Sequence, residues 1–104
     1  MTEQLWFLVT NCPSAQVAKQ IGRALIEEGL VKSANVTAMM ATQYLWEGRL
    51  VENAECQLIV KPLADRREAV AARIEALHPF EVPAIVGWPV AYATEGYLAY
   101  NREP

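Results

Sequence analysis

The sequence predicts an α+β fold, with the element order β-α-β-β-α-β and a short terminal helix, in a single domain that spans residues 1–104. The first observation is size and composition, because 104 residues with 53% hydrophobic and 20% charged content suit one buried core and are too few for two ordinary domains. The second is that short apolar runs typical of strands alternate with stretches of helical periodicity. Turn and helix-end signals that separate these segments are the third.

The first strand and the first helix lie in the N-terminal third of the chain. The continuous apolar run Leu5–Val9 predicts a strand buried on both faces, and the turn-forming residues that follow place Cys12 in a loop. Ser14 is an expected helix N-cap, and Gly29 is an expected stop after the helix. The helix between them is predicted by apolar side chains at helical spacing: Val17, Ala18, Ile21, Ala24 and Leu25.

The middle of the chain predicts a long β-hairpin. Residues 33–46 contain neither Pro nor Gly, and residues 50–61 mirror them across a tight turn at Glu47 and Gly48. An arm of about 14 residues at ~3.3 Å each reaches roughly 46 Å, whereas a compact chain of this length is about 34 Å across, so the hairpin should overhang its own core. In the second arm an apolar face alternates with a largely polar one: Ala54, Cys56, Leu58 and Val60 against Glu55, Gln57, Ile59 and Lys61.

The C-terminal half predicts a second helix, a fourth strand and the terminal helix. Asp65, with Glu68 three residues later, resembles a capping box, and the helix should close at His78 because a residue before Pro disfavours helical geometry. Residues 84–88 predict the strand, and residues 94–101 predict the short helix. This order is that of the ferredoxin-like arrangement, in which both main helices cover one face of an antiparallel sheet.

The sheet face without helices is expected to be an interface between subunits. Because the first strand is apolar at every position, its helix-free side would be exposed in a monomer, and such patches usually mark contacts. The hairpin tip adds large apolar groups, with Trp46 as the expected anchor, and unpaired strand edges. The sequence therefore predicts an oligomer, although these features do not fix the number of subunits.

Charge and the N-terminal residues argue against several classes of partner. The formal net charge is -3 and the Lys and Arg residues are scattered, so we expect no nucleic-acid binding. No basic segment precedes the short apolar run Leu5–Val9, so we expect no membrane association and a cytoplasmic protein. Cys12 and Cys56 are too few for a disulfide scaffold and are expected to be free thiols.

Enzymatic activity is not expected. The residues after the first strand, Thr10 to Ser14, lack the Arg and the glycine-rich phosphate loop of the small ferredoxin-like acylphosphatases. The sequence contains no Ser-His-Asp order and no phosphate-binding G-x-x-x-x-G-K-[ST] motif. His78 is the only histidine that could act as a base near neutral pH.

Several motifs resemble those of the CutA divalent-cation tolerance family. They are the hairpin tip 44–49, Glu55 and Lys61 on the strand that follows, the His-Pro-Phe-Glu-Val-Pro run at 78–83, and the late Tyr-Leu-Ala-Tyr at 97–100. The resemblance covers nearly the whole chain and implies a ferredoxin-like homotrimer with long interlocking hairpins. It also implies a subunit interface or cleft that contains Trp46, Arg49, Glu55, Lys61 and Tyr97.

The resemblance also bears on metal binding. In well-known bacterial members the proposed copper ligands are a Cys near the end of the first strand and two adjacent His before the Pro. Thr10 and Leu77 stand at two of these positions, and only His78 matches. We therefore expect weak binding of copper or another divalent metal ion through His78, with Cys12 as the next donor. Binding should fall in acid, because a ligating imidazole must be neutral.

Three functions stay open at this point. The first is a trimeric metal-responsive or metal-binding protein. The second is a trimeric signalling module, similar in architecture to nitrogen-regulatory proteins, that binds a small anionic ligand in subunit clefts through Lys61 or Arg49. The third is a structural or anchoring trimer. Structural roles also stay open for His78 as a charged group at a helix C-terminus, for Cys56 as a small core hydrophobe, and for Glu55 and Lys61 on a solvated face.

Overall fold

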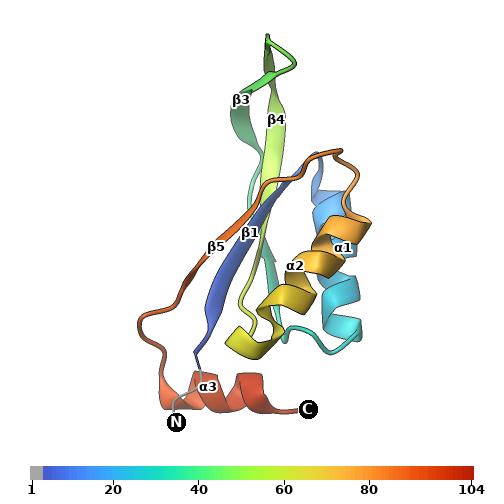
Figure 1. The fold of residues 1–104 in the computed structure, drawn as a ribbon. Helices are drawn as coiled ribbons and strands as arrows, with labels where there is room; N and C mark the ends of the chain where they lie inside the picture. Colours follow the sequence, from blue (N-terminus) through green and yellow to red (C-terminus); the bar gives the residue numbers. More distant parts are fainter. Residues whose placement is uncertain (1–3) are drawn as a thin grey trace.

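The computed structural model describes residues 4–104. The strands are β1 (Trp6–Cys12), β2 (Ala34–Val36), β3 (Met40–Trp46), β4 (Arg49–Val60) and β5 (Ile85–Pro89), and the helices are α1 (Ala15–Glu27), α2 (Arg67–Leu77) and α3 (Glu95–Arg102). A 3-10 turn, η1 (Ala64–Arg66), leads into α2. Figure 1 shows α1 and α2 on one side of the sheet, the β3–β4 hairpin projecting beyond it, and α3 at the opposite end.

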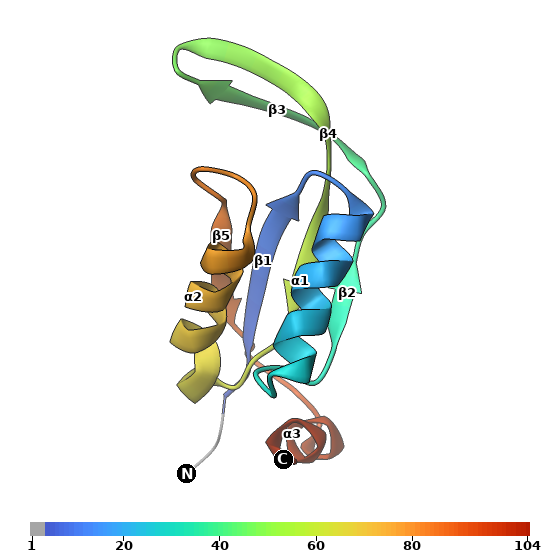
Figure 2. The ribbon, with the colours of Figure 1, turned by 90° about the vertical axis from the view of Figure 1, so that its right-hand side faces the viewer.

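The sheet is antiparallel, with the strand order β2-β4-β1-β5, and β3 pairs with β4. At the centre, Leu8 on β1 lies opposite Val60 on β4 and opposite Gly87 on β5. The face that carries Leu8 and Val60 packs against the helices. Figure 2 looks from the helix side and shows α1 and α2 in front of the sheet. This arrangement confirms the predicted α+β, ferredoxin-like fold with a long central hairpin and a short C-terminal helix.

The core lies between the sheet and the two covering helices. It is formed by buried apolar side chains from β1, β4, α1 and α2 and from the segment after α1: Leu8, Cys12, Ala18, Ile21, Leu25, Val31, Cys56, Leu58, Val60, Val70 and Ile74. The predicted start of α1 is confirmed, because the Ser14 hydroxyl accepts a hydrogen bond from the Val17 N–H at 3.2 Å. Gly29 follows the helix with a φ of 75°, as expected of a C-terminal stop.

The hairpin is confirmed, but its first arm is interrupted. Glu47 and Gly48 both have positive φ angles, 51° and 78°, as a two-residue hairpin turn requires. The prediction of one continuous arm is wrong, because residues 37–39 separate β2 from β3. There the Gln57 N–H donates to the Thr37 hydroxyl at 2.8 Å, so a side chain replaces a backbone acceptor in the ladder. The molecule measures 47 × 26 × 23 Å, and the hairpin accounts for its long axis (Figure 1).

The first strand runs further than predicted, and this moves Cys12. The loop position predicted for Cys12 is wrong, because β1 continues to this residue and pairs it with Cys56 on β4. Beyond this pair, β4 leaves the core sheet and continues as the partner of β3. Ala54 is therefore exposed instead of facing the core. Glu55 is buried, although the alternation had placed it on the polar face.

The start of the second helix also differs from the prediction. Asp65 does not cap α2, because it lies in η1, and Arg66 at the N-cap position makes no side-chain capping bond. The Ala64 N–H instead donates to the Gln4 carbonyl at 2.7 Å, which ties this segment to the start of β1 before the helix begins. Glu68 accepts a hydrogen bond from Arg67 at 2.9 Å. The helix ends at Leu77, one residue before His78, as the following Pro predicts.

The helix-free face exposes apolar groups on β5 more than on β1. The exposure predicted for β1 is wrong in detail, because Val9 is buried and the Phe7 ring stacks on Trp88 at 5.2 Å. On β5 the exposed fractions of Val86 and Trp88 are 56% and 50%. Within residues 4–104, no helix combines the length and apolar character needed to cross a membrane.

Candidate functional site

His78 lies at the C-terminal cap of α2, where it connects the helix layer to the end of β1. Its exposed fraction is 8%, and its Nε2 lies 2.7 Å from the Asn11 carbonyl oxygen. The Phe80 N–H donates to Nδ1 at 3.1 Å. A carbonyl oxygen only accepts and a backbone N–H only donates, so the ring is the neutral tautomer with its proton on Nε2. Metal ligation through Nδ1 therefore requires that Phe80 release this nitrogen.

The same geometry bears on the structural alternative for His78, a charged group at the helix terminus. A protonated ring would carry a proton on Nδ1, where the Phe80 N–H already donates. The observed pattern therefore favours the neutral form, and the ring acts as a cross-link between β1 and the segment after α2.

Cys12 and Cys56 are fully buried, with an exposed fraction of 0% each, and both are free thiols. Burial raises the pKa of the Cys12 thiol to about 11, and the neighbouring Cys56 and Glu55 contribute to the rise. Cys12 is therefore a protonated thiol at neutral pH, and it becomes a metal ligand only by releasing a proton. The core position of Cys56 fits the role of a small hydrophobe.

A polar network next to His78 contains a residue that the sequence reasoning did not select as functional, Asn11. Its Nδ2 donates to the Glu55 carboxylate at 3.1 Å, and its Oδ1 accepts from the Gln57 side chain at 3.2 Å. Its backbone carbonyl contacts His78. Asn11 thus links His78 to Glu55. The only sequence signal was the alternating Glu55 and Gln57, which marked the neighbouring strand but not Asn11.

The remaining predicted site residues lie apart from this network. The Lys61 amine donates to the Asn35 side chain at 3.2 Å and lies 5.5 Å from the Phe7 ring centre. Arg49 pairs with Trp46 at the hairpin tip. Lys61 and Arg49 are separated by the length of β4, roughly 40 Å at ~3.3 Å per residue, so they cannot share a cleft within one chain. Tyr97 lies on α3, with its ring 6.0 Å from that of Tyr100.

Exposed apolar side chains gather on the hairpin. Leu45 and Leu50, which face each other across the turn, have exposed fractions of 73% and 67%. Partly exposed large side chains continue along β3 and the residue before it: Met39, Met40, Tyr44 and Trp46. Apolar groups at this density on a projecting hairpin are typical of a surface that another protein chain covers.

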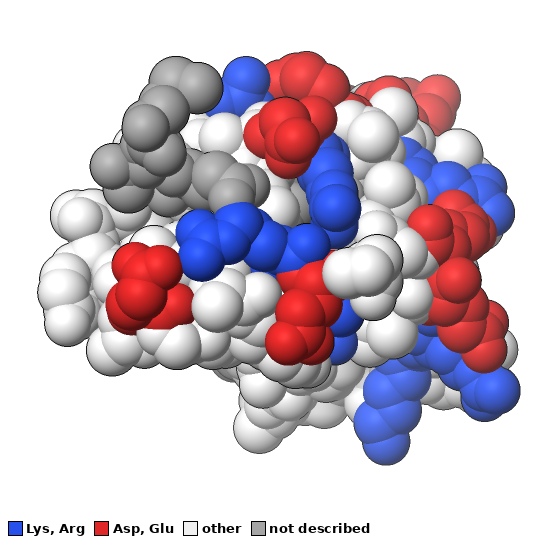
Figure 3. Space-filling view, turned by 90° about the horizontal axis from the view of Figure 1, so that it is seen from below, with Lys and Arg blue, Asp and Glu red and all other residues white. Residues whose placement is uncertain are grey.

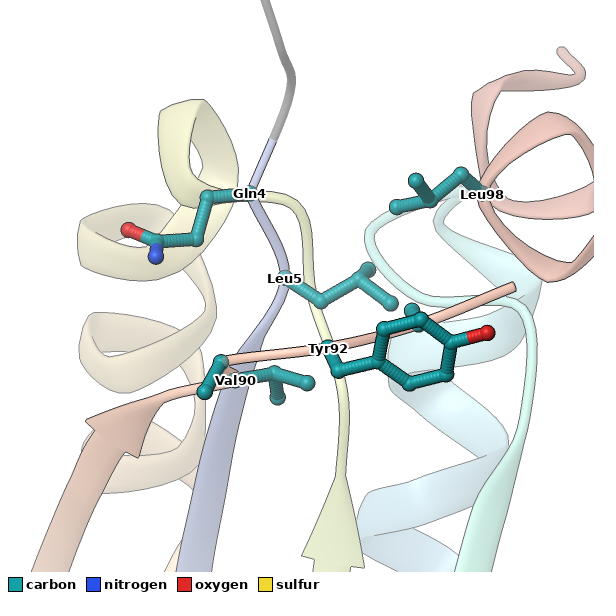
Figure 4. Close-up of a pocket in the computed structure, with 7 residues that line it drawn as sticks. Gln4, Leu5, Val90, Tyr92 and Leu98 are labelled. Carbon is teal, nitrogen blue, oxygen red and sulfur yellow. The ribbon is translucent and has the colours of Figure 1, made fainter. Parts of the chain in front are cut away.

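A hollow of about 430 Å³ lies at the other end of the molecule, between the start of β1, the segment after β5, and α3. Figure 4 shows Leu5, Val90, Tyr92 and Leu98 around it, with Gln4 at its edge. Among the described residues, none that lines this hollow is charged.

In Figure 3 Lys and Arg side chains lie among Asp and Glu across the face seen from below, with no broad patch of one sign. Among residues 4–104, no three His, Cys, Asp or Glu side chains gather as a metal cluster would require.

Comparison with known proteins identifies the family to which residues 6–104 belong. A family model described as CutA1 divalent ion tolerance protein matches residues 6–104. The divalent-cation tolerance protein CutA of Thermus thermophilus is 38% identical over 96 residues, which are 92% of this chain and 93% of that protein. A solved structure of the divalent cation tolerance protein from Thermus thermophilus is similar with a TM-score of 0.86 at 35% identity, covering 97% of this chain and 96% of that one.

A second solved structure agrees in fold. The CutA1 protein of Ehrlichia chaffeensis has a TM-score of 0.90 at 27% identity, covering 97% of this chain and 94% of that one. The family match extends from the first residue of β1 to the end of the chain, and so includes the hairpin, the His78 segment and α3. The chain belongs to the CutA1 divalent ion tolerance protein family.

Proposed function

We propose that this protein acts in divalent-cation tolerance as a homotrimer, in which the helix-free sheet faces meet and each hairpin packs against a neighbouring subunit. One observation carries the proposal: the hairpin extends beyond its own core while exposing apolar side chains, above all Leu45 and Leu50. A monomer would leave this surface in water, whereas a subunit interface buries it.

The helix-free face supports the same assembly. Val86 and Trp88 are half exposed there, and Trp88 stacks on Phe7. A closed ring of identical subunits covers this face and leaves no strand edge free for further growth. Three subunits follow from the family resemblance of the hairpin-tip and Tyr97 motifs, and we place Trp46, Arg49, Glu55, Lys61 and Tyr97 at or near the interface.

We further propose that the protein binds a divalent metal ion weakly and through His78. The ring offers one nitrogen, Nδ1, and only after the Phe80 N–H is displaced, because Nε2 is held by the Asn11 carbonyl. A single imidazole must share the ion with water or oxygen donors, which suits neither tight nor selective capture. Cys12 is the next donor in this proposal, and its raised pKa makes it a poor one.

Copper titration tests the His78 site. We expect weak Cu²⁺ binding by the wild-type protein, because the ring offers a single nitrogen and the remaining ligands are water or oxygen. His78→Ala should abolish this binding, while Tyr92→Ala, at an exposed position away from His78, should leave it unchanged. Tight binding that His78→Ala does not alter would place the site elsewhere.

The other functional alternatives receive less support. An anionic ligand would need free cationic groups in a cleft, but the Lys61 amine is engaged with Asn35 and with the Phe7 ring.

We also propose that the protein is not an enzyme, since His78 has both nitrogens hydrogen-bonded and the Cys12 thiol is protonated. A cytoplasmic location is part of the same proposal, and the two free thiols support it because reducing compartments maintain them.

A further inference from the structure

An apolar groove of about 250 Å³ lies on the outer surface of the helix layer, between α1 and the end of α2. In Figure 2 these two helices lie side by side in front of the sheet. The α1 wall of the groove is formed by Val17, Gln20, Ile21 and Ala24. Their spacing of i, i+3, i+4 and i+7 places these side chains on one face of the helix. Among residues 4–104, none that lines this groove is charged.

The α2 wall of the groove follows from the way in which that helix ends. At His78 the backbone is extended, with φ -76° and ψ 136°, and the imidazole turns inward to the Asn11 carbonyl. Neighbouring side chains point in opposite directions along an extended backbone, so Leu77 and Pro79 lie on the outer side, where both line the groove. The exposed fraction is 36% for Leu77 and 3% for Ile21. The groove therefore has a buried apolar floor and an exposed apolar rim.

A second hollow, of about 350 Å³, adjoins this groove and is polar and positively charged. It shares Gln20 with the groove and is otherwise lined by Gln16, Lys19 and Arg23 on the exposed face of α1. No Asp or Glu in the described part of the chain lines it, although the whole chain carries a net charge of -3. Arg23 pairs with Glu27 at 2.9 Å, whereas Lys19 makes no ion pair within the described residues. The Lys19 amine can therefore pair with an anionic group from another molecule.

The size and the charge of the two hollows favour a segment of another protein as the occupant. Small-molecule sites usually enclose about 300–1,000 Å³ and bury most of the ligand, and the groove is smaller than this. It suits a single large apolar side chain, and the neighbouring amine suits a carboxylate on the same segment. We propose that the groove binds a short acidic segment of a partner protein, with a Leu or Phe side chain between α1 and α2 and an Asp or Glu side chain at Lys19.

This inference goes beyond the proposed function and uses neither the metal role of His78 nor the hairpin. The helices lie on the sheet face opposite to the one that meets the neighbouring subunits in the proposed trimer, so the groove stays open to solvent there. A short segment docked in the groove covers far less than the roughly 1,200–2,000 Å² of a stable interface. The contact should therefore be weak and reversible.

The test is an NMR titration of the isotope-labelled full-length protein, in metal-free buffer, with the acetylated and amidated peptide Glu-Glu-Leu-Phe-Glu-Glu. We expect saturable binding in the millimolar range or tighter, with amide shifts centred on Val17, Gln20, Ile21 and Leu77. A peptide with Ala-Ala in place of Leu-Phe should not bind. A peptide with Gln in place of Glu should bind more weakly, and only the binding of the acidic peptide should depend on salt.

Substitutions in the protein separate the two parts of the site. Leu77→Ala should weaken binding of the acidic peptide about 10-fold or more, as loss of an anchor contact does. Lys19→Gln should weaken it about two- to fivefold at low salt and leave it unchanged at high salt, because exposed ion pairs are weak and screened. Ile26→Ala is the matched control, since Ile26 is 41% exposed on the same helix but lines a different hollow with Ala34 and Val36. It should bind the peptide as the wild type does.

Light scattering keeps this inference separate from the proposed trimer, because Leu77→Ala should not change the mass of the assembly. Should Leu77→Ala not fold by circular dichroism, Ala24→Gln obstructs the groove from its other wall and replaces it. No saturable binding at millimolar peptide, or equal binding by Leu77→Ala and the wild type, would overturn the site. Phenylbutyrate that binds as tightly as the peptide would make the occupant a small apolar acid. A mass that rises with concentration in the wild type but not in Leu77→Ala would make it a second copy of the chain. Either result would overturn the proposed partner.

Discussion

Trp46→Ala is expected to weaken the association of subunits by about 2 kcal/mol or more for each contact, which is roughly a 30-fold higher dissociation constant. Trp46 lies at the end of β3, beside the turn of the projecting hairpin, and is too far out to serve the core of its own chain. Its loss should therefore change assembly and leave the isolated fold intact.

Sedimentation or light scattering across a dilution series measures this effect, and far-UV circular dichroism reports on the fold. Gln43→Ala is the matched control, because Gln43 lies on the same hairpin and makes an exposed hydrogen bond to Glu52. It should dissociate at the same concentration as the wild type. If Trp46→Ala also does so, Trp46 is not an interface anchor.

Gly87→Ala should destabilise the fold by about 3 kcal/mol, at the upper end of the usual cost of overpacking. Gly87 lies on β5 opposite Leu8, and a Cβ there would stand 2.2 Å from the Phe7 carbonyl oxygen and 2.4 Å from a methyl group of Leu8. The carbonyl belongs to the neighbouring backbone, so the contact is relieved only by moving β5 away from β1.

Chemical denaturation at a fixed protein concentration tests this expectation. Gly96→Ala is the matched control, since within residues 4–104 a Cβ at this position on α3 would have no atom within 4 Å other than its chain neighbours and the backbone of its own helix. It should be neutral or stabilise the protein by about 0.5–1 kcal/mol, because Ala is the better helix former. Equal denaturation midpoints for the two variants would show that β5 can move away from β1 at Gly87 at little cost in stability.

Local chemistry explains which parts of the fold could be predicted. Ser14 caps α1 through its own hydroxyl, and the turn at Glu47 and Gly48 needs two positive φ angles that a Gly at the second position eases. These signals act between residues that are at most four positions apart, so they can be recognised in the sequence alone. The approximate positions of β1 and β5 were also predictable, because a short apolar run indicates a strand whichever strand it pairs with.

Long-range pairing explains the errors. Cys12 follows an Asn and precedes a Pro, a pattern typical of a turn, but pairing with Cys56 on a strand 44 residues later extends β1 through it. The break between β2 and β3 depends on the Thr37 hydroxyl meeting the Gln57 N–H, a contact across the ladder. The loss of the Asp65 cap has the same origin, since Gln4 holds the preceding segment.

The candidate site shows the same division. His78 could be selected because it is the only histidine and stands before a Pro. Its protonation pattern depends on the Asn11 carbonyl, 67 residues earlier, and on Phe80. The facing of the two cysteines emerges only when β1 and β4 are in register. The type of side chain was enough to select His78 as a candidate ligand. Its hydrogen-bond partners could be identified only from the folded structure.

The mass of the protein in solution tests the central claim most directly. Multi-angle light scattering at micromolar concentration should give about 35 kDa, three times the chain mass of 11.6 kDa. The reason is that one chain leaves the hairpin and the exposed groups of β5 uncovered, and in the proposed trimer the neighbouring chains would cover both. A mass of 11.6 kDa that persists as the concentration rises would contradict the account, because the apolar hairpin would then have no partner.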